Sequence, residues 1–143
     1  MTPEEQKEFL KNHRLVIVGV ARKDGPPHMS PVYYVMDGDD ILISTTESRI
    51  KTKAIRRNPA VSLCILGEQM PFPYLTVYGR GVIEQQGAVE LMMKIGARIT
   101  GSPVPESARP AVEKRAKDEG RVVLRVTPER TSHMTPYNIP KQL

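Results

Sequence analysis

The sequence contains no tryptophan, only seven aromatic residues in all, and a single cysteine, Cys64. Its core must therefore be built mainly from Val, Ile, Leu and Met. One cysteine excludes an internal disulfide framework and suits a reducing compartment. Because Cys64 lies in the apolar segment 60–66, we expect it to be a buried structural thiol.

Long apolar runs are also missing. No segment approaches the roughly 20 apolar residues of a membrane-spanning helix, and the acidic, amphipathic start of the chain is unlike a signal peptide. We expect a soluble, cytoplasmic protein that binds no membrane. With 143 residues, of which 39% are hydrophobic and 26% charged, the chain fits one globular domain spanning residues 1–143.

Several common catalytic patterns are absent. The chain has no G-x-G-x-x-G motif and no P-loop, which argues against nucleotide binding of the Rossmann or P-loop type. His13, His28 and His133 are far apart and have no ligand partners at motif spacing, so we expect no metal site. No Ser-His-Asp or Cys-His arrangement is recognisable, and we assign no catalytic residue.

The positive charge is concentrated in one short segment. The net charge is +5, and residues 49–57 alone contain five basic residues and no acidic residue. Such a concentration favours one local binding site for an anion. Nucleic-acid binding would require a broader basic surface, preferably with exposed aromatic residues for base stacking, and is not expected.

Hydrophobic periodicity predicts mainly β structure. Strand-like composition bounded by turn residues places strands at 14–22, 28–36, 41–45, 60–66, 74–85 and 121–128. The first of these is almost continuously apolar, which predicts burial on both faces. Helical patterns cover 3–12, 49–57, 87–100 and 108–119.

The order of these elements predicts the fold class. Short turns join the early strands and indicate antiparallel pairing, and one helix separates the third strand from the fourth. A small antiparallel barrel of mainly β (α+β) class fits this order, because a parallel doubly wound sheet would need helices between most strands. Gly79 and Gly81 lie within the fifth strand and predict a sharp bend or bulge there.

The segment 44–59 has the composition of an anion receptor. The strand before it ends in hydroxyl residues, namely Ser44, Thr45 and Thr46. A short cationic helix follows, with Ser48 as its expected N-cap. Backbone N–H groups and the dipole at a helix N-terminus attract anions, Arg49 can bind a phosphate bidentately, and Lys51 and Lys53 add charge. A simply solvated helix face is the alternative.

Two proline-containing segments could adjoin such a site. Pro31 lies inside the second strand, and because proline cannot donate to a β-ladder, this strand is either an edge strand or carries a break. A break would let a flat ring lie against backbone polar groups. The stiff segment 71–74 presents Phe72 and Tyr74, which could pack over a ring or into a neighbouring subunit; ordinary loop packing is the alternative.

These segments resemble the pyridoxamine 5′-phosphate oxidase-like superfamily of split-barrel flavoproteins, and within it a branch of coenzyme F420-dependent oxidoreductases. The resemblance covers about residues 13–130 and rests on DGPPHMSPVYYVMDGDDILIST, RIKTKAIRRNPAVSLCIL, PYLTVYGRGVIE and RVVLRVTPER. The basic residues followed by RRNPAVSL are fairly specific for the superfamily. These residues distinguish less well between members that bind FMN and members that bind F420.

The resemblance implies a six-stranded antiparallel split β-barrel that forms a homodimer and holds a phosphorylated flavin or deazaflavin at the subunit interface. The residues implied to line the ring of the cofactor are Ser30, Pro31, Val32 and Tyr33. Those implied to hold its phosphate are Thr45, Thr46, Arg49, Lys51 and Lys53, and Ser44 and Ile50 belong to the same cofactor-binding set. Tyr74 would come from the partner subunit. Many relatives have an asparagine where this chain has Ala54, which departs from the pattern.

Both FMN and coenzyme F420 fit this resemblance, and the charge favours F420. FMN has one terminal phosphate, whereas F420 carries a phosphodiester, a lactyl group and a chain of glutamates, which suits five bases better. The implied activity is hydride transfer between coenzyme F420 and a small organic acceptor. An FMN-dependent enzyme of the same superfamily and a non-catalytic protein that binds a flavin or a tetrapyrrole are the alternatives.

Overall fold

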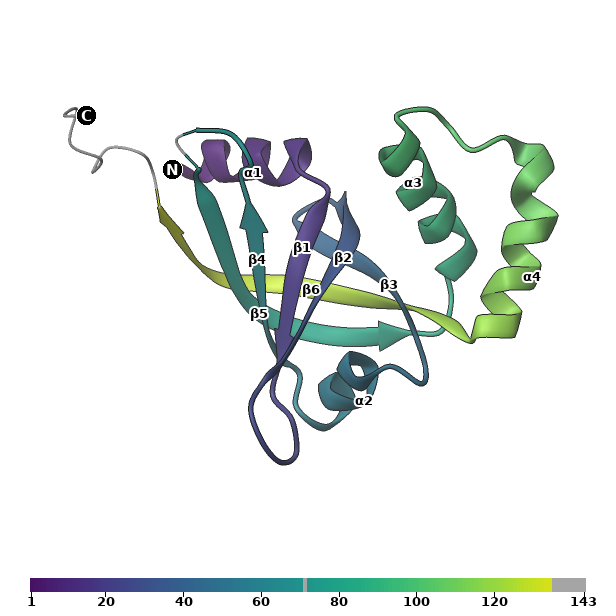
Figure 1. Ribbon diagram of the computed structural model, residues 1–143, viewed down its shortest axis with the longest axis horizontal. Coiled ribbons are helices and arrows are strands. Elements are labelled where there is room, and N and C mark those ends of the chain that lie inside the picture. The colour runs from purple at the N-terminus through teal and green to yellow at the C-terminus, as the bar shows by residue number, and fades with distance from the viewer. Residues whose placement is uncertain (71, 135–143) are drawn as a thin grey trace.

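The computed structural model describes residues 1–70 and 72–134, and its centre is a closed barrel of six antiparallel strands in the order β1-β2-β3-β6-β5-β4 (Figure 1). The strands are β1 (Leu15–Val20), β2 (His28–Asp37), β3 (Asp40–Thr46), β4 (Ala60–Leu66), β5 (Tyr74–Glu84) and β6 (Arg121–Met134). The helices are α1 (Pro3–Asn12), α2 (Ile50–Arg57), α3 (Ala88–Thr100) and α4 (Arg109–Glu119), with a 3-10 turn, η1, at Glu106–Ala108. The predicted six-stranded antiparallel barrel is confirmed.

The predicted helix boundaries agree with the structure to within one residue, but β6 is much longer than predicted. It continues to Met134 instead of ending at residue 128. Residues 121–126 pair with β3, and the stretch from Val123 to Met134 pairs with β5. Pairing between distant segments stabilises the second half of β6, whose own sequence has no clear strand periodicity.

The burial of β1 differs from the prediction. The side chains that point into the barrel are Val16, Val18 and Val20. Leu15 and Ile17 alternate with them and lie on the outer surface, so the prediction of burial on both faces was wrong. Cys64 pairs opposite Ile17 and is half-buried on the same outer face, which corrects the expectation of a buried thiol. The reason is that the barrel interior buries one face of the strand, whereas burial of the outer face depends on what packs against it, whatever the apolar content of the strand.

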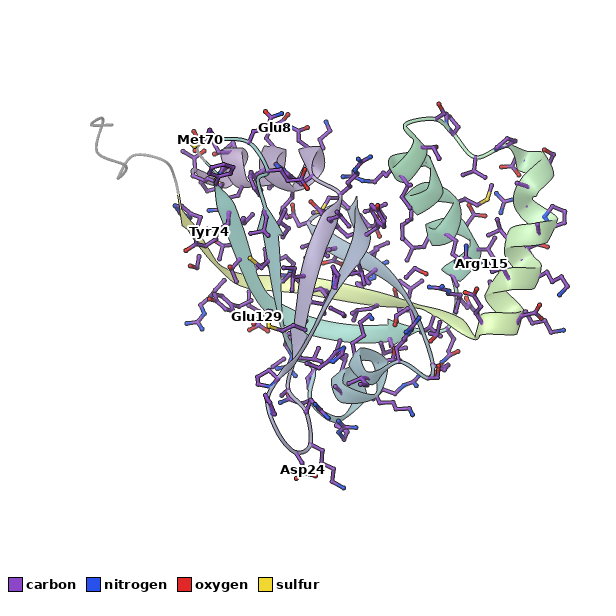
Figure 2. All side chains as sticks on the ribbon, viewed as in Figure 1. Glu8, Asp24, Met70, Tyr74, Arg115 and Glu129 are labelled. Atoms are coloured by element: carbon purple, nitrogen blue, oxygen red, sulfur yellow. The ribbon has the colours of Figure 1, made fainter. Side chains whose placement is uncertain are left out.

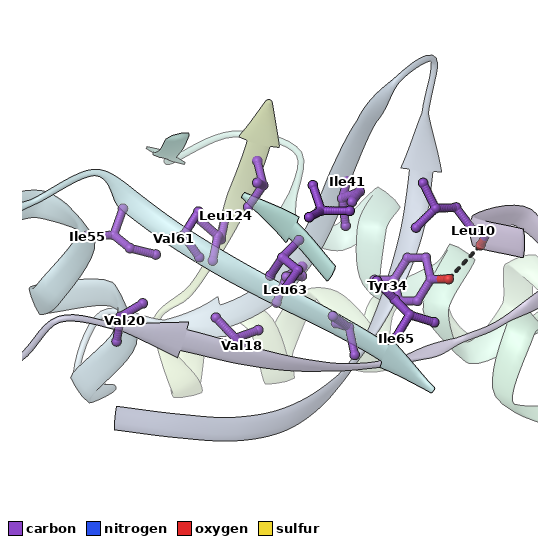
Figure 3. Packing of buried hydrophobic residues seen from close by; sticks show 14 of the residues in the cluster. Leu10, Val18, Val20, Tyr34, Ile41, Ile55, Val61, Leu63, Ile65 and Leu124 are labelled. Atoms are coloured by element: carbon purple, nitrogen blue, oxygen red, sulfur yellow. Dashed lines mark hydrogen bonds between the residues drawn. The ribbon is translucent and has the colours of Figure 1, made fainter. Parts of the chain in front are cut away.

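The barrel is filled by side chains from all six strands and from two helices (Figure 3). Val18, Leu63 and Leu124 have no exposed surface, and burial of each such side chain contributes about 1.5–3 kcal/mol. At one end the hydroxyl of Tyr34 donates to the carbonyl of Leu10, 2.5 Å away, and so ties α1 to the barrel. Burial raises the pKa of Tyr34, which therefore stays neutral and can donate this bond.

Helix α2 closes the opposite end of the barrel (Figure 1). Ala54 and Ile55 of α2 are 1% and 3% exposed and belong to the core. Gly81 of β5 allows this close approach, because a Cβ there would lie 2.9 Å from Leu124 Cδ1 and 3.1 Å from Ile55 Cγ2. The core thus holds α2 against the barrel wall, and this contact positions the basic residues of the helix.

The α3–α4 pair lies on the outside of the barrel, beside β2, β3 and β6 (Figure 1). A second, smaller apolar cluster attaches it, formed by Val35, Leu42, Leu91 and Val123. The pair therefore covers the outer face of the strands next to the place where β2 and β3 separate.

Candidate anion-binding site

The candidate site lies where β2 and β3 separate. The two strands pair with each other only between 34–37 and 40–43. Residues 28–33 of β2 pair with β1, whereas Ser44, Thr45 and Thr46 of β3 pair with β6. The barrel wall therefore opens between the first half of β2 and the end of β3. The chain runs from that end of β3 directly into α2.

Pro31 lies in the part of β2 that borders this opening. Tyr34 donates its backbone N–H to the carbonyl of Arg14 at 3.0 Å. Because hydrogen-bonded and non-hydrogen-bonded pairs alternate in an antiparallel ladder, the nitrogen of Pro31, opposite Ile17, faces away from β1 and toward the opening. Its missing N–H removes no bond to β1. At Pro31, β2 pairs with β1 alone and its pairing with β3 begins only at Tyr34, so the segment is locally an edge, with no break in the β1–β2 ladder.

Hydroxyl groups fix the turn between β3 and α2. Thr52 is fully buried, and its Oγ1 donates to the carbonyl of Thr46 at 2.7 Å. The Thr45 hydroxyl therefore donates to Thr52 Oγ1, 3.1 Å away. Ser48 Oγ lies 3.2 Å from Thr46 Oγ1 and does not cap the helix; the N-cap is Arg49, without a side-chain cap from the described residues, so the Ser48 prediction was wrong. The first-turn N–H groups of α2 thus have no side-chain acceptor within the described chain.

Lys51 is the buried cation of the site. It is 7% exposed, and its Nζ reaches from α2 to donate to Ser30 Oγ on β2 at 3.4 Å. No carboxylate in the described parts of the chain pairs with it. Burial, and then the positive charges of Arg49 and Arg121, lower the pKa of Lys51. A buried ammonium with one long hydrogen bond and two cationic neighbours is unfavourable unless an anion joins it.

Arg121 was missed by the sequence analysis. It begins β6, opposite Thr46 in the β3–β6 ladder, and its side chain is 19% exposed. Its Nη1 lies 3.5 Å from Ser44 Oγ, and its Nε donates to Glu119 at 2.6 Å. No local pattern connects position 121 with 44–51, because strand pairing alone brings the two segments together.

One of the five bases of 49–57 is neutralised within the chain. Arg56 forms a two-bond ion pair with Glu47, which lies just outside the basic segment. Gln85 also donates to Glu47, at 2.7 Å. The hydrogen bonds from Arg56 and Gln85 lower the pKa of Glu47 to about 2, so this carboxylate is ionised at neutral pH. Arg56 is therefore not available to a bound anion in the way that Lys51 is.

The structure brings some predicted residues together and separates others. Val32, Tyr33 and Ser44 line one cavity of about 310 Å³. Ile50 and Lys53 line a different cavity, of about 260 Å³.

The described part of the predicted aromatic segment lies far from the basic helix. Tyr74 begins β5 at the barrel end near α1, far from α2 (Figure 2). Its contribution to a partner's site stays a prediction. Phe72 is 56% exposed, and Pro71 lies outside the described residues.

We expect Thr52→Val to destabilise the protein by about 1–2 kcal/mol, because the buried carbonyl of Thr46 and the hydroxyl of Thr45 each lose a partner. Urea unfolding measures the change. The matched control is Thr76→Val, at a half-buried threonine whose hydroxyl bonds to none of the described residues. Equal stability of the two variants would contradict a structural role for the Thr52 hydroxyl.

Within residues 1–70 and 72–134, no group of three or more His, Cys, Asp and Glu side chains is arranged to hold a metal ion. No helix in these ranges is both long and apolar enough to cross a bilayer.

Comparison with known families identifies the chain. The family model of pyridoxamine 5′-phosphate oxidase matches residues 2–135. The chain belongs to this family. The resemblance to the pyridoxamine 5′-phosphate oxidase-like superfamily that the sequence indicated is thereby confirmed. A search of curated proteins finds no match.

Solved structures of related fold agree with this assignment. A conserved hypothetical protein from Mycobacterium tuberculosis superposes with a TM-score of 0.85 at 21% identity, covering 100% of this chain and 91% of its own. A protein described as an F420 reductase superposes with a TM-score of 0.70 at 24% identity, covering 88% of this chain and 94% of its own. A FAD-binding protein from Mesorhizobium loti superposes with a TM-score of 0.65 at 19% identity, covering 93% of this chain and 94% of its own. At such identities these likenesses show a shared fold alone.

Proposed function

We propose that this member of the pyridoxamine 5′-phosphate oxidase family is an oxidoreductase that transfers a hydride between coenzyme F420 and a small organic acceptor. The observation that carries the proposal is Lys51, a buried ammonium beside an opening in the barrel wall with no carboxylate partner among the described residues. Such a group needs an anion, and a cofactor phosphate supplies one. The edge of β2 at Pro31 that does not pair with β3 would be available to a flat ring.

The chain's own residues would hold the cofactor in two parts. Lys51 and Arg49, with the free N–H groups at the start of α2, would bind the phosphate. The segment 30–33 would lie along the ring. When bound, the cofactor supplies the hydride chemistry, and the protein supplies position and exclusion of water.

A second basic region favours F420 over FMN as the cofactor. The cavity of about 260 Å³ next to α2 is lined by Arg22, Lys23, Lys53 and Arg57, with Asp24 as its one acidic lining residue among those described. A chain of glutamates could extend from the phosphate site across this cavity, whereas FMN has no group to place there. The charge of Lys53, which lies away from Lys51, would then contribute to tail binding.

The homodimer is part of the same proposal. On the outer face of β1, β2, β4 and β5, Met29 is 64% exposed beside a hollow of about 660 Å³ that Ile17, Cys64 and Tyr78 also line. Leu66, at the end of β4, is 51% exposed. Apolar surface of this extent is typical of a subunit interface. Sedimentation equilibrium should give twice the monomer mass of 16.0 kDa, and a monomer at micromolar concentration would contradict the proposal.

Titration of the purified protein with F420 and with FMN, followed by fluorescence, tests the cofactor assignment. We expect micromolar or tighter binding of F420 and weaker binding of FMN. Tighter binding of FMN than of F420 would mean that FMN is the cofactor. Binding of neither would refute the redox function. Hydride transfer from the reduced cofactor to quinone-like acceptors then separates an enzyme from a protein that only carries the cofactor.

A further inference from the structure

A cationic cavity lies between the barrel and the α3–α4 pair. Its volume is about 310 Å³. Met92, Ile95 and Ile99 of α3 form an apolar wall, and Arg115 and Arg121 supply positive charge. We call it the arginine cavity. Figure 2 shows Arg115 on α4, beside α3.

The two arginines of this cavity share one carboxylate. Glu119 accepts a hydrogen bond from Arg121 Nε at 2.6 Å and one from Arg115 Nε at 2.9 Å. These hydrogen bonds lower the pKa of Glu119, so it is ionised at neutral pH. None of the described residues that line the cavity is acidic. Two guanidinium groups against one carboxylate leave an excess positive charge at the cavity.

Arg121 retains donors for a ligand. Its side chain is 19% exposed, and apart from Glu119 its one hydrogen bond to a described residue is the long contact of 3.5 Å with Ser44 Oγ. A partly desolvated guanidinium with unused N–H groups binds a carboxylate strongly, because the planar donors match the two carboxylate oxygens. The charge of Lys51 lies near enough for Arg121 to affect its pKa, which adds to the positive potential.

The shape of the cavity defines the class of ligand. Its volume is at the lower limit of small-molecule sites, which suits a molecule with one ring or a short branched chain. The wall of Met92, Ile95 and Ile99 suits an apolar body, and the arginine pair suits one negative charge. Val32 and Tyr33 also line it, and these two residues belong to the segment predicted to lie along the cofactor ring.

We propose that the arginine cavity is the substrate site, and that the substrate is a small organic acid. Arg121 and Arg115 bind its carboxylate, and its apolar body packs against the α3 wall. The assignment as substrate rests on the proposed function. The capacity to bind an organic acid rests on the cavity alone.

Calorimetric titration of the cofactor-free protein with cinnamate and with its neutral amide, cinnamamide, tests this site. We expect cinnamate to bind at least about tenfold more tightly than cinnamamide, the scale of one charge-assisted contact. Amide resonances of Tyr33 and Ile95 should shift on binding. Arg121→Gln should weaken cinnamate binding about tenfold, and Arg115→Gln, at a more exposed position, should weaken it several-fold.

A third variant separates ligand binding from structural damage. Glu119→Gln removes the carboxylate that competes for both arginines, so it should tighten cinnamate binding several-fold. A variant that merely loosened the fold could not produce tightening, and Glu119 ends α4, where loss of a negative charge is favourable to the helix dipole. Glu113→Gln, an exposed acid on the same helix, is the matched control and should leave the affinity unchanged.

Three results would overturn the proposal: equal affinity for cinnamate and cinnamamide, unchanged cinnamate affinity in both arginine variants, or competitive displacement of cinnamate by F420 or FMN. The last would assign the arginines to the cofactor itself. Failure of the proposed function is distinguishable from these results. In that case F420 and FMN would not bind, while cinnamate would still bind and respond to the Arg121 and Glu119 variants.

Discussion

Replacement of Lys51 by methionine should stabilise the cofactor-free protein by about 1 kcal/mol and weaken its affinity for phosphate and for F420 at least about tenfold. Methionine fills the same buried space without the desolvated ammonium, which has only Ser30 Oγ as a partner within the described chain. The affinity falls because the bound anion loses its buried cation. Urea unfolding without ligand and titration with phosphate and F420 measure the two effects.

Two further variants control this experiment. Lys53→Met removes the same charge from an exposed position of the same helix and should leave the stability unchanged within about 0.5 kcal/mol. Lys51→Glu should weaken cofactor binding by at least ~1–2 kcal/mol. If the Lys51→Met protein is less stable than wild type and binds phosphate normally, Lys51 does not belong to the anion site.

The same lysine predicts a pH dependence. Its pKa in the folded protein is lowered from the ordinary value of 10.5. Between these two pKa values the unfolded chain binds more protons than the native protein, so the contribution of Lys51 to stability rises with pH across that window. Over the same window anion binding should weaken, because the ammonium is lost. Both trends should be reduced in Lys51→Met, and an identical pH profile of the variant would contradict the assignment.

Gly79→Ala should destabilise the protein by about 3 kcal/mol, which corresponds to a fall in melting temperature of about 10 °C. At Gly79 the register of β5 against β6 shifts: Tyr78 pairs with Arg130, whereas Gly79 pairs with Pro128. A Cβ at this position would overlap the backbone carbonyl of Thr127. A backbone atom within a ladder cannot move aside as the end of a side chain can, so the strands themselves must separate. Thermal unfolding followed by circular dichroism measures the change.

The matched control for this variant is Gly19→Ala in β1. Its nearest neighbours would be the carbonyl of Ser62 at 3.6 Å and the Ser62 Cβ at 3.9 Å, which are ordinary contact distances. We expect a change within about 0.5 kcal/mol. Comparable losses for the two variants would mean that glycine flexibility in strands, rather than the close approach at Gly79, is responsible.

Local pattern predicted the helix boundaries accurately, although the Ser48 cap of α2 was wrong, because start and stop signals act within a few residues. Thr2 and Glu5 form the reciprocal cap of α1 within the chain's first residues. The bulge at Gly79 was also predictable, since glycines within a strand often mark one. The exposure of the outer face of β1 was not predictable, because apolar content does not say which face of a strand is covered.

The basic helix after β3 was predictable from adjacent residues, but the contacts of its side chains were not. The segment 44–53 contains both the hydroxyl groups and Lys51, and strand-to-helix order brings them to one turn. Glu47, which neutralises Arg56, lies in the same stretch, but an ion pair depends on side-chain directions that spacing alone does not define. Arg121 joins the site only through the β3–β6 ladder.

Residue order thus specified the elements of this chain, the family to which it belongs and the location of its concentrated positive charge, since all three depend on contiguous residues. The tertiary structure determined that Lys51 is buried, that Arg56 is neutralised by Glu47, and that Lys53 lines a separate cavity. It also produced the opening beside Pro31 and the cavity between Arg115 and Arg121. These properties depend on contacts between segments as far apart in the sequence as Ile41 and Val126. Burial and electrostatic neighbours arise from such contacts.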